Sequence, residues 1–259
     1  MRQKKEIPWI FPIKTSPTAR MRLFCFPYAG GSPQVFKSWA DRLPAETEVF
    51  SILLPGRGAR LFDPLYSDMD TLVPTIAKEI KPHLEKPFVF FGHSMGAMIG
   101  FELTHLLLEQ HNRRPLHLIL SGRFSPEHKS PRRPLHNLED KELIEELKRL
   151  NGTPRELLEH EEMMELMLGS LRADFSVCET YRYQPKQPLP CPLTVFGGHE
   201  DPDVAEHQLV TWKNYTTGPF ELEMFDGDHF FIQSNEVLVL KRINQILAPI
   251  LPQIARAGL

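Results

Sequence analysis

The chain has 259 residues, of which 41% are apolar and 24% are charged, and this suits one large globular domain or two small ones. The formal net charge of −3 provides no overall field that would attract nucleic acid or an anionic membrane. Cys25, Cys178 and Cys191 are odd in number and far apart, which argues against a disulfide framework or a zinc site and favours a reducing cytoplasm.

The N-terminus begins with MRQKK, which resembles the basic start of a signal peptide. The apolar run behind it is too short for one and is interrupted by Glu6, Pro8 and Pro12. No stretch approaches the roughly 18 apolar residues that span a bilayer. We therefore expect a cytoplasmic protein that is neither exported nor inserted into a membrane.

Short apolar runs alternate with helical patterns along the chain. Strands are predicted at 21–26, 49–54, 88–91, 117–121, 193–196 and 221–225, and helices at 33–42, 70–84, 95–110 and 235–250. Most of the strand runs are almost continuously apolar, as in strands that are covered on both faces of a parallel sheet. The alternation predicts an α/β fold with right-handed crossovers.

The interval 122–190 is far longer than a crossover between two strands needs. It opens with the basic stretch RFSPEHKSPRRP and closes with the proline-rich stretch QPKQPLPCP. Helices are predicted inside it at about 139–150, 153–159 and 161–172. Because long insertions between sheet elements are usually functional, we expect a single domain over 1–259 with a helical lid at about 122–190.

A nucleophile elbow is predicted where the buried strand FVFF runs into Gly92-His93-Ser94-Met95-Gly96 and a helix follows. Such a turn is so tight that the residues two before and two after the serine must be small, a condition that both glycines meet. The strained backbone holds the serine hydroxyl at the carboxyl edge of the sheet. The helix N-terminus behind it favours developing negative charge. This pattern is typical of the α/β-hydrolase fold, with Ser94 as the nucleophile.

A serine nucleophile needs a histidine base, which follows it late in the chain in this fold. Among eleven histidines, His229 is the best placed, because it lies in the tight loop between the last strand and the last helix. We expect His93 to face away from the direction of the nucleophile, and His199 either to lie behind the catalytic residues and support them or to be at the surface. Asp226 and Asp228 flank the base and are expected to shape its loop.

The acid that orients the base should follow the penultimate strand, within VFGGHEDPDV at 195–204. Asp201 is the preferred candidate because the proline after it fixes a turn, and Asp203 is the alternative. Glu127, after the preceding strand, is a more distant option.

An oxyanion hole needs two backbone N–H donors. Met95, directly after the nucleophile, is expected to provide one of them. The second is expected from the loop after the first core strand, Pro27-Tyr28-Ala29-Gly30-Gly31. Ala29 is the first candidate there and Gly30 the second.

Several segments together closely resemble the type II thioesterases, the stand-alone enzymes that accompany nonribosomal peptide and polyketide synthetases. The resemblance extends from about residue 20 to 250. It rests on FCFPYAGGSPQVFKSWA (24–40), LLPGRGAR (53–60), FVFFGHSMGAMIGFEL (88–103), LRADF (171–175), FGGHEDPDV (196–204) and FDGDHFFI (225–232). It implies the triad Ser94, Asp201 and His229, with Ala29 and Met95 as the oxyanion hole. Two departures do not touch the triad: Tyr28 stands where many members have His or Phe, and Asp228 where Gly is common.

The resemblance implies an enzyme that hydrolyses aberrant or stalled acyl thioesters on the phosphopantetheine arm of carrier proteins. No metal or cofactor is required, and we expect a monomer. Medium-chain fatty-acyl thioesterases, general esterases or lipases, and a non-catalytic carrier-binding module are the alternatives.

A basic cluster offers a possible docking surface for an acidic carrier protein. Lys129, Arg132 and Arg133 lie at the start of the lid, and Arg113 and Arg114 lie just before the preceding strand. The alternative interpretation is a solvated basic loop.

Overall fold

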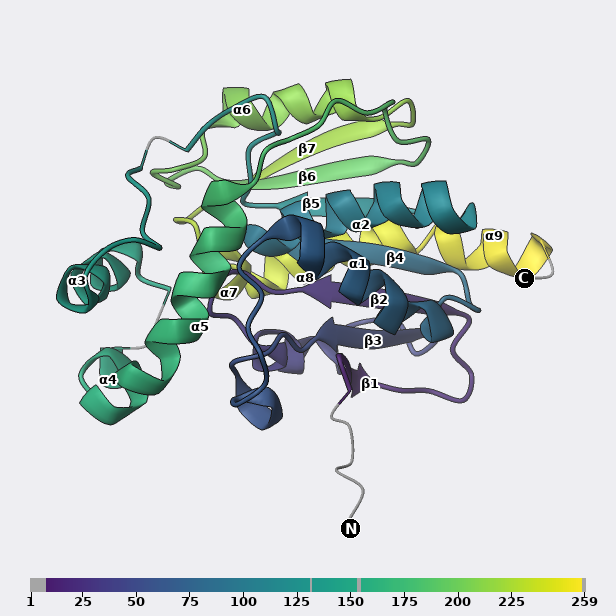
Figure 1. Cartoon of the computed structure of the whole chain (residues 1–259). Helices are drawn as coiled ribbons and strands as arrows, with labels where there is room; N and C mark the ends of the chain where they lie inside the picture. Colours follow the sequence, from purple (N-terminus) through teal and green to yellow (C-terminus); the bar gives the residue numbers. More distant parts are fainter. Residues whose placement is uncertain (1–7, 131, 153–154, 258–259) are drawn as a thin grey trace, which may run out of the picture.

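The computed structural model describes residues 8–130, 132–152 and 155–257, and within these ranges seven strands form one sheet (Figure 1). The strands are β1 (Ile10–Lys14), β2 (Met21–Phe26), β3 (Thr47–Ile52), β4 (Phe88–His93), β5 (Leu118–Ser121), β6 (Leu193–Gly198) and β7 (Phe220–Phe225). Their order across the sheet is β1-β3-β2-β4-β5-β6-β7. The strands β2 to β7 are parallel, and β1 pairs antiparallel with β3. The predicted α/β class is confirmed.

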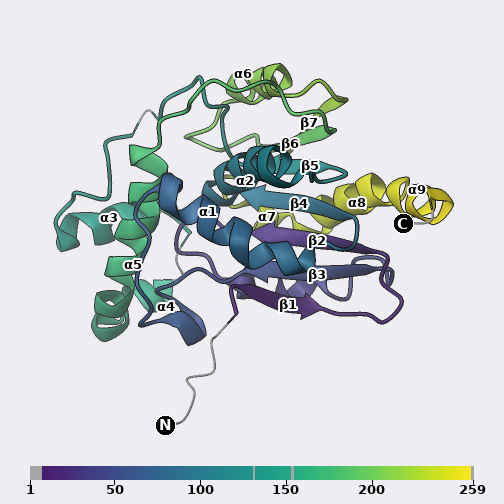
Figure 2. The same cartoon turned by 45° about the vertical axis from the view of Figure 1, so that its right-hand side comes forward.

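Helices cover both faces of the sheet, with α1 and α2 on one side and α8 and α9 on the other (Figures 1 and 2). The α-helices are α1 (Met69–Ile80), α2 (Met95–His111), α3 (Asp140–Leu150), α4 (Arg155–Leu158), α5 (Glu161–Thr180), α6 (Glu206–Val210), α7 (Phe231–Ser234), α8 (Glu236–Leu247) and α9 (Ile250–Ala257). Alternate strand residues face opposite ways, so Phe24 and Phe26 pack toward α2 while Leu23 and Cys25 pack toward α8. Covering on both faces explains why the strands are almost continuously apolar.

All six predicted strands are present, with ends that differ by at most two residues, but β1 was not predicted. Its sequence IFPIK contains Pro12, which has no N–H to donate to a neighbouring strand. Such a residue is tolerated at the edge of a sheet, which is where β1 lies, and its register with β3 is irregular between Pro12 and Lys14.

Three of the predicted helices differ from the structure. The segment predicted as a helix at 33–42 is a 3-10 helix, Pro33–Trp39. The helix predicted at 70–84 ends as α1 at Ile80 and continues as a 3-10 turn, Lys81–His83. The helix predicted at 235–250 ends as α8 at Leu247, before α9.

The long segment between β5 and β6 carries α3, α4 and α5, the lid helices (Figure 1). Residues 153 and 154, where the second lid helix was predicted to begin, lie outside the described residues. The helix α5 extends eight residues beyond its predicted end at residue 172, to Thr180. Val177, near the end of α5, joins the main core, whereas Leu143 and Leu147 of α3 belong to a separate small cluster with α5 residues from Met164 to Leu171. The end of α5 is therefore part of the main core, whereas α3 lies outside it.

No helix in the described part of the chain has the length and apolar character needed to cross a membrane.

Candidate active site

Ser94 lies at a strained turn between β4 and α2. Its backbone has φ 55° and ψ −112°, a conformation that L-residues rarely adopt. A Cβ atom at Gly92 would lie 2.1 Å from the carbonyl oxygen of Gly96, and one at Gly96 would lie 2.0 Å from that of Phe26. The glycines predicted from the sequence are therefore sterically required. They let β4, the elbow and the end of β2 approach one another.

His229 lies in the loop between β7 and α7, and its Nδ1 lies 2.6 Å from Oδ2 of Asp201. The Asp201 side chain is fully buried at the end of β6, while His229 is half-buried. Because an ionised carboxylate only accepts hydrogen bonds, the imidazole donates from Nδ1 and keeps the lone pair on Nε2. This is the tautomer that a general base requires. Ser94 and His229 both line the same cavity.

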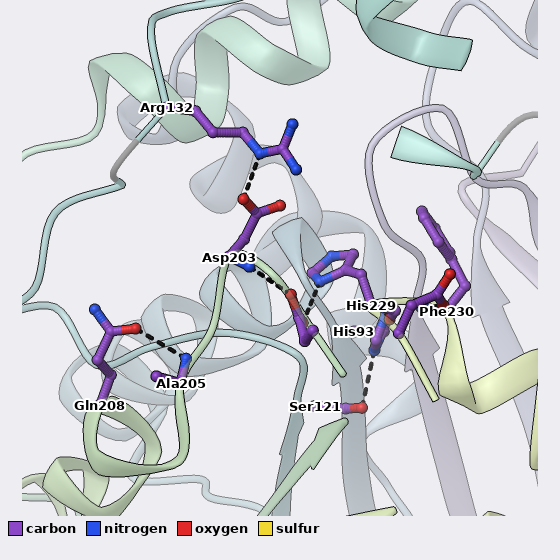
Figure 3. Close-up of polar contacts among 10 residues, drawn as sticks. His93, Ser121, Arg132, Asp203, Ala205, Gln208, His229 and Phe230 are labelled. Atoms are coloured by element: carbon purple, nitrogen blue, oxygen red, sulfur yellow. Dashed lines mark hydrogen bonds and ion pairs between the residues drawn. The ribbon is translucent and has the colours of Figure 1, made fainter. Parts of the chain in front are cut away.

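The two aspartates of the acid loop have different partners. Asp203 forms an ion pair with Arg132 of the lid, while its backbone N–H donates to Oδ1 of Asp201 at 2.9 Å (Figure 3). Glu127, the distant option, is exposed, and its carboxylate lies 3.6 Å from the imidazole of His128. Asp201 is thus the candidate acid that the fold brings to His229.

Asp228 and His199 lie as expected. Asp228 accepts a hydrogen bond from the backbone N–H of Phe230 at 2.8 Å and so shapes the loop. His199 is exposed.

His93 has a more specific environment than the sequence indicated. Its side chain is buried between β5 and the histidine loop (Figure 3). Burial is the main cause that holds the pKa of His93 well below its ordinary value, and the nearby charge of His229 is the second cause. Its Nε2 lies 2.9 Å from the carbonyl oxygen of His229 and must donate, since a carbonyl only accepts. Its Nδ1 then accepts from the hydroxyl of Ser121 at 2.8 Å. The neutral ring therefore ties the backbone of His229 to β5.

The loop after β2 passes beside the elbow, as an oxyanion hole requires. A Cβ atom at Gly96 would lie 2.8 Å from the carbonyl oxygen of Pro27. The N–H of Gly30, the second candidate donor, already donates to Asp174 at 2.7 Å. Among the described residues, the amides of Ala29 and Met95 have no hydrogen-bond acceptor. Ala29 and Met95 are thus the two candidate donors that remain free for a ligand.

A cavity of about 700 Å³ opens in front of Ser94. One part of its wall is apolar and comes largely from the lid, with Leu147, Leu150, Leu157, Met167, Leu171 and Phe175. Another part is polar and includes Arg123, whose guanidinium lies 4.2 Å from the centre of the Phe124 ring. Burial lowers the pKa of Arg123. The cavity has the size and mixed lining of a site for a small acyl ligand.

In the described ranges, no group of three or more His, Cys, Asp or Glu side chains is arranged to hold a metal ion.

Two residues at the site were not singled out by sequence reasoning. Arg57 and Asp174 form a buried ion pair beside the loop that carries Ala29. Both lie in segments that support the resemblance to type II thioesterases, PGR at 55–57 and LRADF at 171–175. The presence of both residues in segments that resemble the type II thioesterases could have drawn attention to them. The sequence alone does not show that the two segments meet.

A parallel sheet flanked by helices, with a serine on a strained strand-to-helix elbow and a histidine–aspartate pair at the carboxyl ends of the strands, defines an α/β-hydrolase. The family model described as a thioesterase domain matches residues 21–247. The gramicidin S biosynthesis protein GrsT of Aneurinibacillus migulanus is 40% identical over 93% of this chain and 96% of its own. The linear gramicidin dehydrogenase LgrE of Brevibacillus parabrevis is 40% identical over 92% of each chain.

Among solved structures, the type II thioesterase BorB from the borrelidin biosynthetic cluster is 33% identical, with a TM-score of 0.84 over 92% of this chain and 96% of its own. The chain therefore belongs to the thioesterase family, among the type II thioesterases, and it is a thioester hydrolase. The name of LgrE denotes a dehydrogenase, whereas the family model and BorB are both described as thioesterases, in agreement with the serine elbow.

Proposed function

We propose that this protein hydrolyses aberrant or stalled acyl groups from the phosphopantetheine arm of carrier proteins in nonribosomal peptide or polyketide biosynthesis. The observation that carries the proposal is the cavity of about 700 Å³, because it joins Ser94 and His229 to a long apolar wall from the lid. An acyl chain fits such a wall, and the polar part of the lining suits the amides of a pantetheine arm.

The proposed reaction has two halves. His229 accepts the proton of Ser94 as its oxygen attacks the thioester carbonyl, and the amides of Ala29 and Met95 stabilise the oxyanion. The carbon–sulfur bond breaks, and the thiolate leaves with the proton that His229 returns. Water then attacks the acyl-enzyme with His229 as the base, the ester bond to Ser94 breaks, and His229 returns the proton to the Ser94 oxygen as the carboxylic acid leaves. Asp201 holds the imidazole in the required tautomer and stabilises its protonated form.

The charges at the cavity mouth limit how a carrier protein docks. Arg132 is paired with Asp203, and Arg133 with Glu142 and Glu146, so both are largely neutralised within the chain. Arg113 and Arg114 follow the C-terminal end of α2, whereas the elbow lies at the N-terminal end of this helix. The two arginines are therefore near the amino ends of the strands, away from the active site. The five cations therefore do not form one cluster. Lys129 is exposed and lines the cavity, so it is the cation we assign to docking.

The test compares one acyl group on a carrier protein and on N-acetylcysteamine, at low and high salt. We expect a higher kcat/KM for the carrier-bound thioester, an advantage that shrinks with salt and with Lys129→Glu. Ser94→Ala should lose turnover by several orders of magnitude and should not react with a fluorophosphonate probe. Turnover by Ser94→Ala would contradict the mechanism.

The acyl panel also separates the alternative functions. Equal hydrolysis of carrier-bound and small thioesters at all salt concentrations would favour a general acyl thioesterase, such as a medium-chain fatty-acyl enzyme. Preference for oxygen esters would favour an esterase or lipase. We propose a cytoplasmic monomer, in line with its three free cysteines, and sedimentation of the purified protein tests the monomer.

A further inference from the structure

A buried arginine reaches from the loop after β3 to the loop after β2. Arg57 has 9% of its side chain exposed, and its Nη1 donates to the carbonyl oxygen of Gly31 at 3.0 Å. Its Nη2 donates to Oδ1 of Asp174, on α5, at 2.8 Å. Three segments far apart in sequence therefore meet at one guanidinium.

The carboxylate of Asp174 is used on both oxygens. Oδ1 accepts from Arg57, and Oδ2 accepts from the backbone N–H of Gly30 at 2.7 Å. Only 5% of the Asp174 side chain is exposed, so water does not readily replace either partner. The carbonyl oxygen of Gly31 and the N–H of Gly30 are thus fixed by charged groups directly after Ala29.

The packing at this point is as close as glycine allows. A Cβ atom at Gly30, which has φ +77°, would lie 2.6 Å from Cδ2 of Leu171 on α5. One at Gly56, which has φ +79°, would lie 2.6 Å from Cβ of Ser170. Both loops are therefore pressed against the same stretch of the lid helix.

We propose that Arg57 and Asp174 are positioning residues for the oxyanion hole: they hold the Gly30–Gly31 turn so that the N–H of Ala29 faces the substrate carbonyl at Ser94. This inference rests on the proposed function of Ala29. Preorganised donors are effective because their orientation is fixed before charge develops, and a loop turn held by hydrogen bonds from an ion pair meets that condition. Neither Arg57 nor Asp174 is among the residues that line the cavity.

The same network makes the hole depend on α5. If α5 moved away from the sheet, Asp174 would leave the Gly30 amide without its acceptor and Arg57 without its counter-charge. The oxyanion hole is then complete only while the second half of α5 is docked. This part of the lid acts as a wall of the active site, to which Leu171 and Phe175 contribute.

The test uses variants that weaken the network with little change in shape. Asp174→Asn keeps the volume of the side chain and removes its negative charge. Arg57→Lys keeps the positive charge but loses the two guanidinium nitrogens that donate to Gly31 and Asp174 at the same time. For both, kcat per fluorophosphonate-titrated site should fall, by about 10²-fold for Asp174→Asn, while KM changes little. Affinity for hexylboronic acid, whose tetrahedral adduct places an oxygen in the hole, should fall in parallel. The double variant should lose little more than the worse single variant, since both act on one turn.

The matched control is Arg172→Gln, two residues before Asp174 on α5. It removes an ion pair with Asp140 and a hydrogen bond to the carbonyl oxygen of His136, neither of which involves the Gly30–Gly31 turn, and it is expected to keep the wild-type kcat and boronate affinity. A purely structural role for the buried pair would lower Tm in Asp174→Asn but leave both the kcat per titrated site and the boronate affinity at wild-type values. That result, measured at a temperature where the variant is folded, would overturn the proposal.

The outcome is independent of the substrate assignment. If the wild-type enzyme hydrolyses oxygen esters and not thioesters, the proposed function fails. The comparison of boronate affinities between the wild type and the variants still reports whether Arg57 and Asp174 position the oxyanion hole.

Discussion

Asp201 and Asp203 are two residues apart, yet they have different partners. The side chain of Asp201 is buried against His229, whereas that of Asp203 binds Arg132 of the lid. Pro202 lies between the two aspartates, and their carboxylates point to different partners. That of Asp201 faces the imidazole of His229, and that of Asp203 faces Arg132, which precedes α3. The loop therefore supplies both a candidate catalytic group and a connection to the lid.

Asp201→Asn should lose most activity, while Asp203→Asn should lose little. An asparagine can present an amide N–H to Nδ1 of His229, which favours the wrong tautomer, and in a comparable triad this substitution lowered kcat by about 10⁴-fold. The measurement is kcat on one small acyl thioester for each purified variant. A loss for Asp203→Asn equal to that for Asp201→Asn would mean that the acid is assigned to the wrong residue.

Among the elements, the lid helices differ in how they are attached. The second half of α5 packs in the main core through Val177 and is tied down by Asp174. The helix α3 belongs to a small cluster with Met164, Leu168 and Leu171 of α5. The segments on either side of α3 are joined to the loops of the sheet by the Arg132–Asp203 ion pair and by a hydrogen bond of 3.3 Å from Asn151 to Asp228.

Hydrogen exchange should therefore be graded along the lid. Amides of α3 are expected to exchange faster than those of α5 from residue 173 onward, because few buried contacts oppose the opening of α3. Arg132→Ala should speed exchange in α3 and leave the end of α5 unchanged. Equal exchange rates in α3 and in the second half of α5 would show that the whole insertion moves as one unit.

At the scale of the whole molecule, buried histidines link stability to pH. Burial is the main cause that lowers the pKa of His93, and it lowers those of His105 and His117 to about 4. The unfolded chain binds protons at these residues near pH 6.5, while the folded chain does not. The stability that the neutral rings provide is present above pH 6.5 and is lost as the pH falls toward 4.

His117→Gln should reduce this pH dependence. His117 bonds to the hydroxyl of Thr194 at 2.8 Å, a contact that glutamine can replace without titrating. Between pH 7 and pH 5, the loss of unfolding free energy should be smaller in the variant by at most about 2 kcal/mol. Urea unfolding at the two pH values measures it, and an identical loss in both proteins would show that His117 is not a linked site.

The sequence by itself predicted six of the seven described strands, the elbow and the residues of the candidate triad. Strands covered on both faces are almost continuously apolar. Glycine at position 92 avoids a clash with the carbonyl oxygen of Gly96 within the same turn, whereas glycine at position 96 makes room for the carbonyl oxygen of Phe26 at the end of β2. The order of serine, acid and histidine follows from the places where parallel strands end. The strand pattern and the elbow motif can be recognised from residue type and spacing, so the sequence alone predicts them even where, as at Gly96, the steric reason lies in another segment.

Only the tertiary structure decided which groups from distant segments meet. It joined Arg57 to Asp174, gave the Gly30 amide an acceptor, and turned His93 toward the carbonyl of His229. It also placed β1 at an edge where Pro12 is tolerated. Each result depends on the close approach of segments that are far apart in the chain, and residue type and spacing do not encode that approach locally.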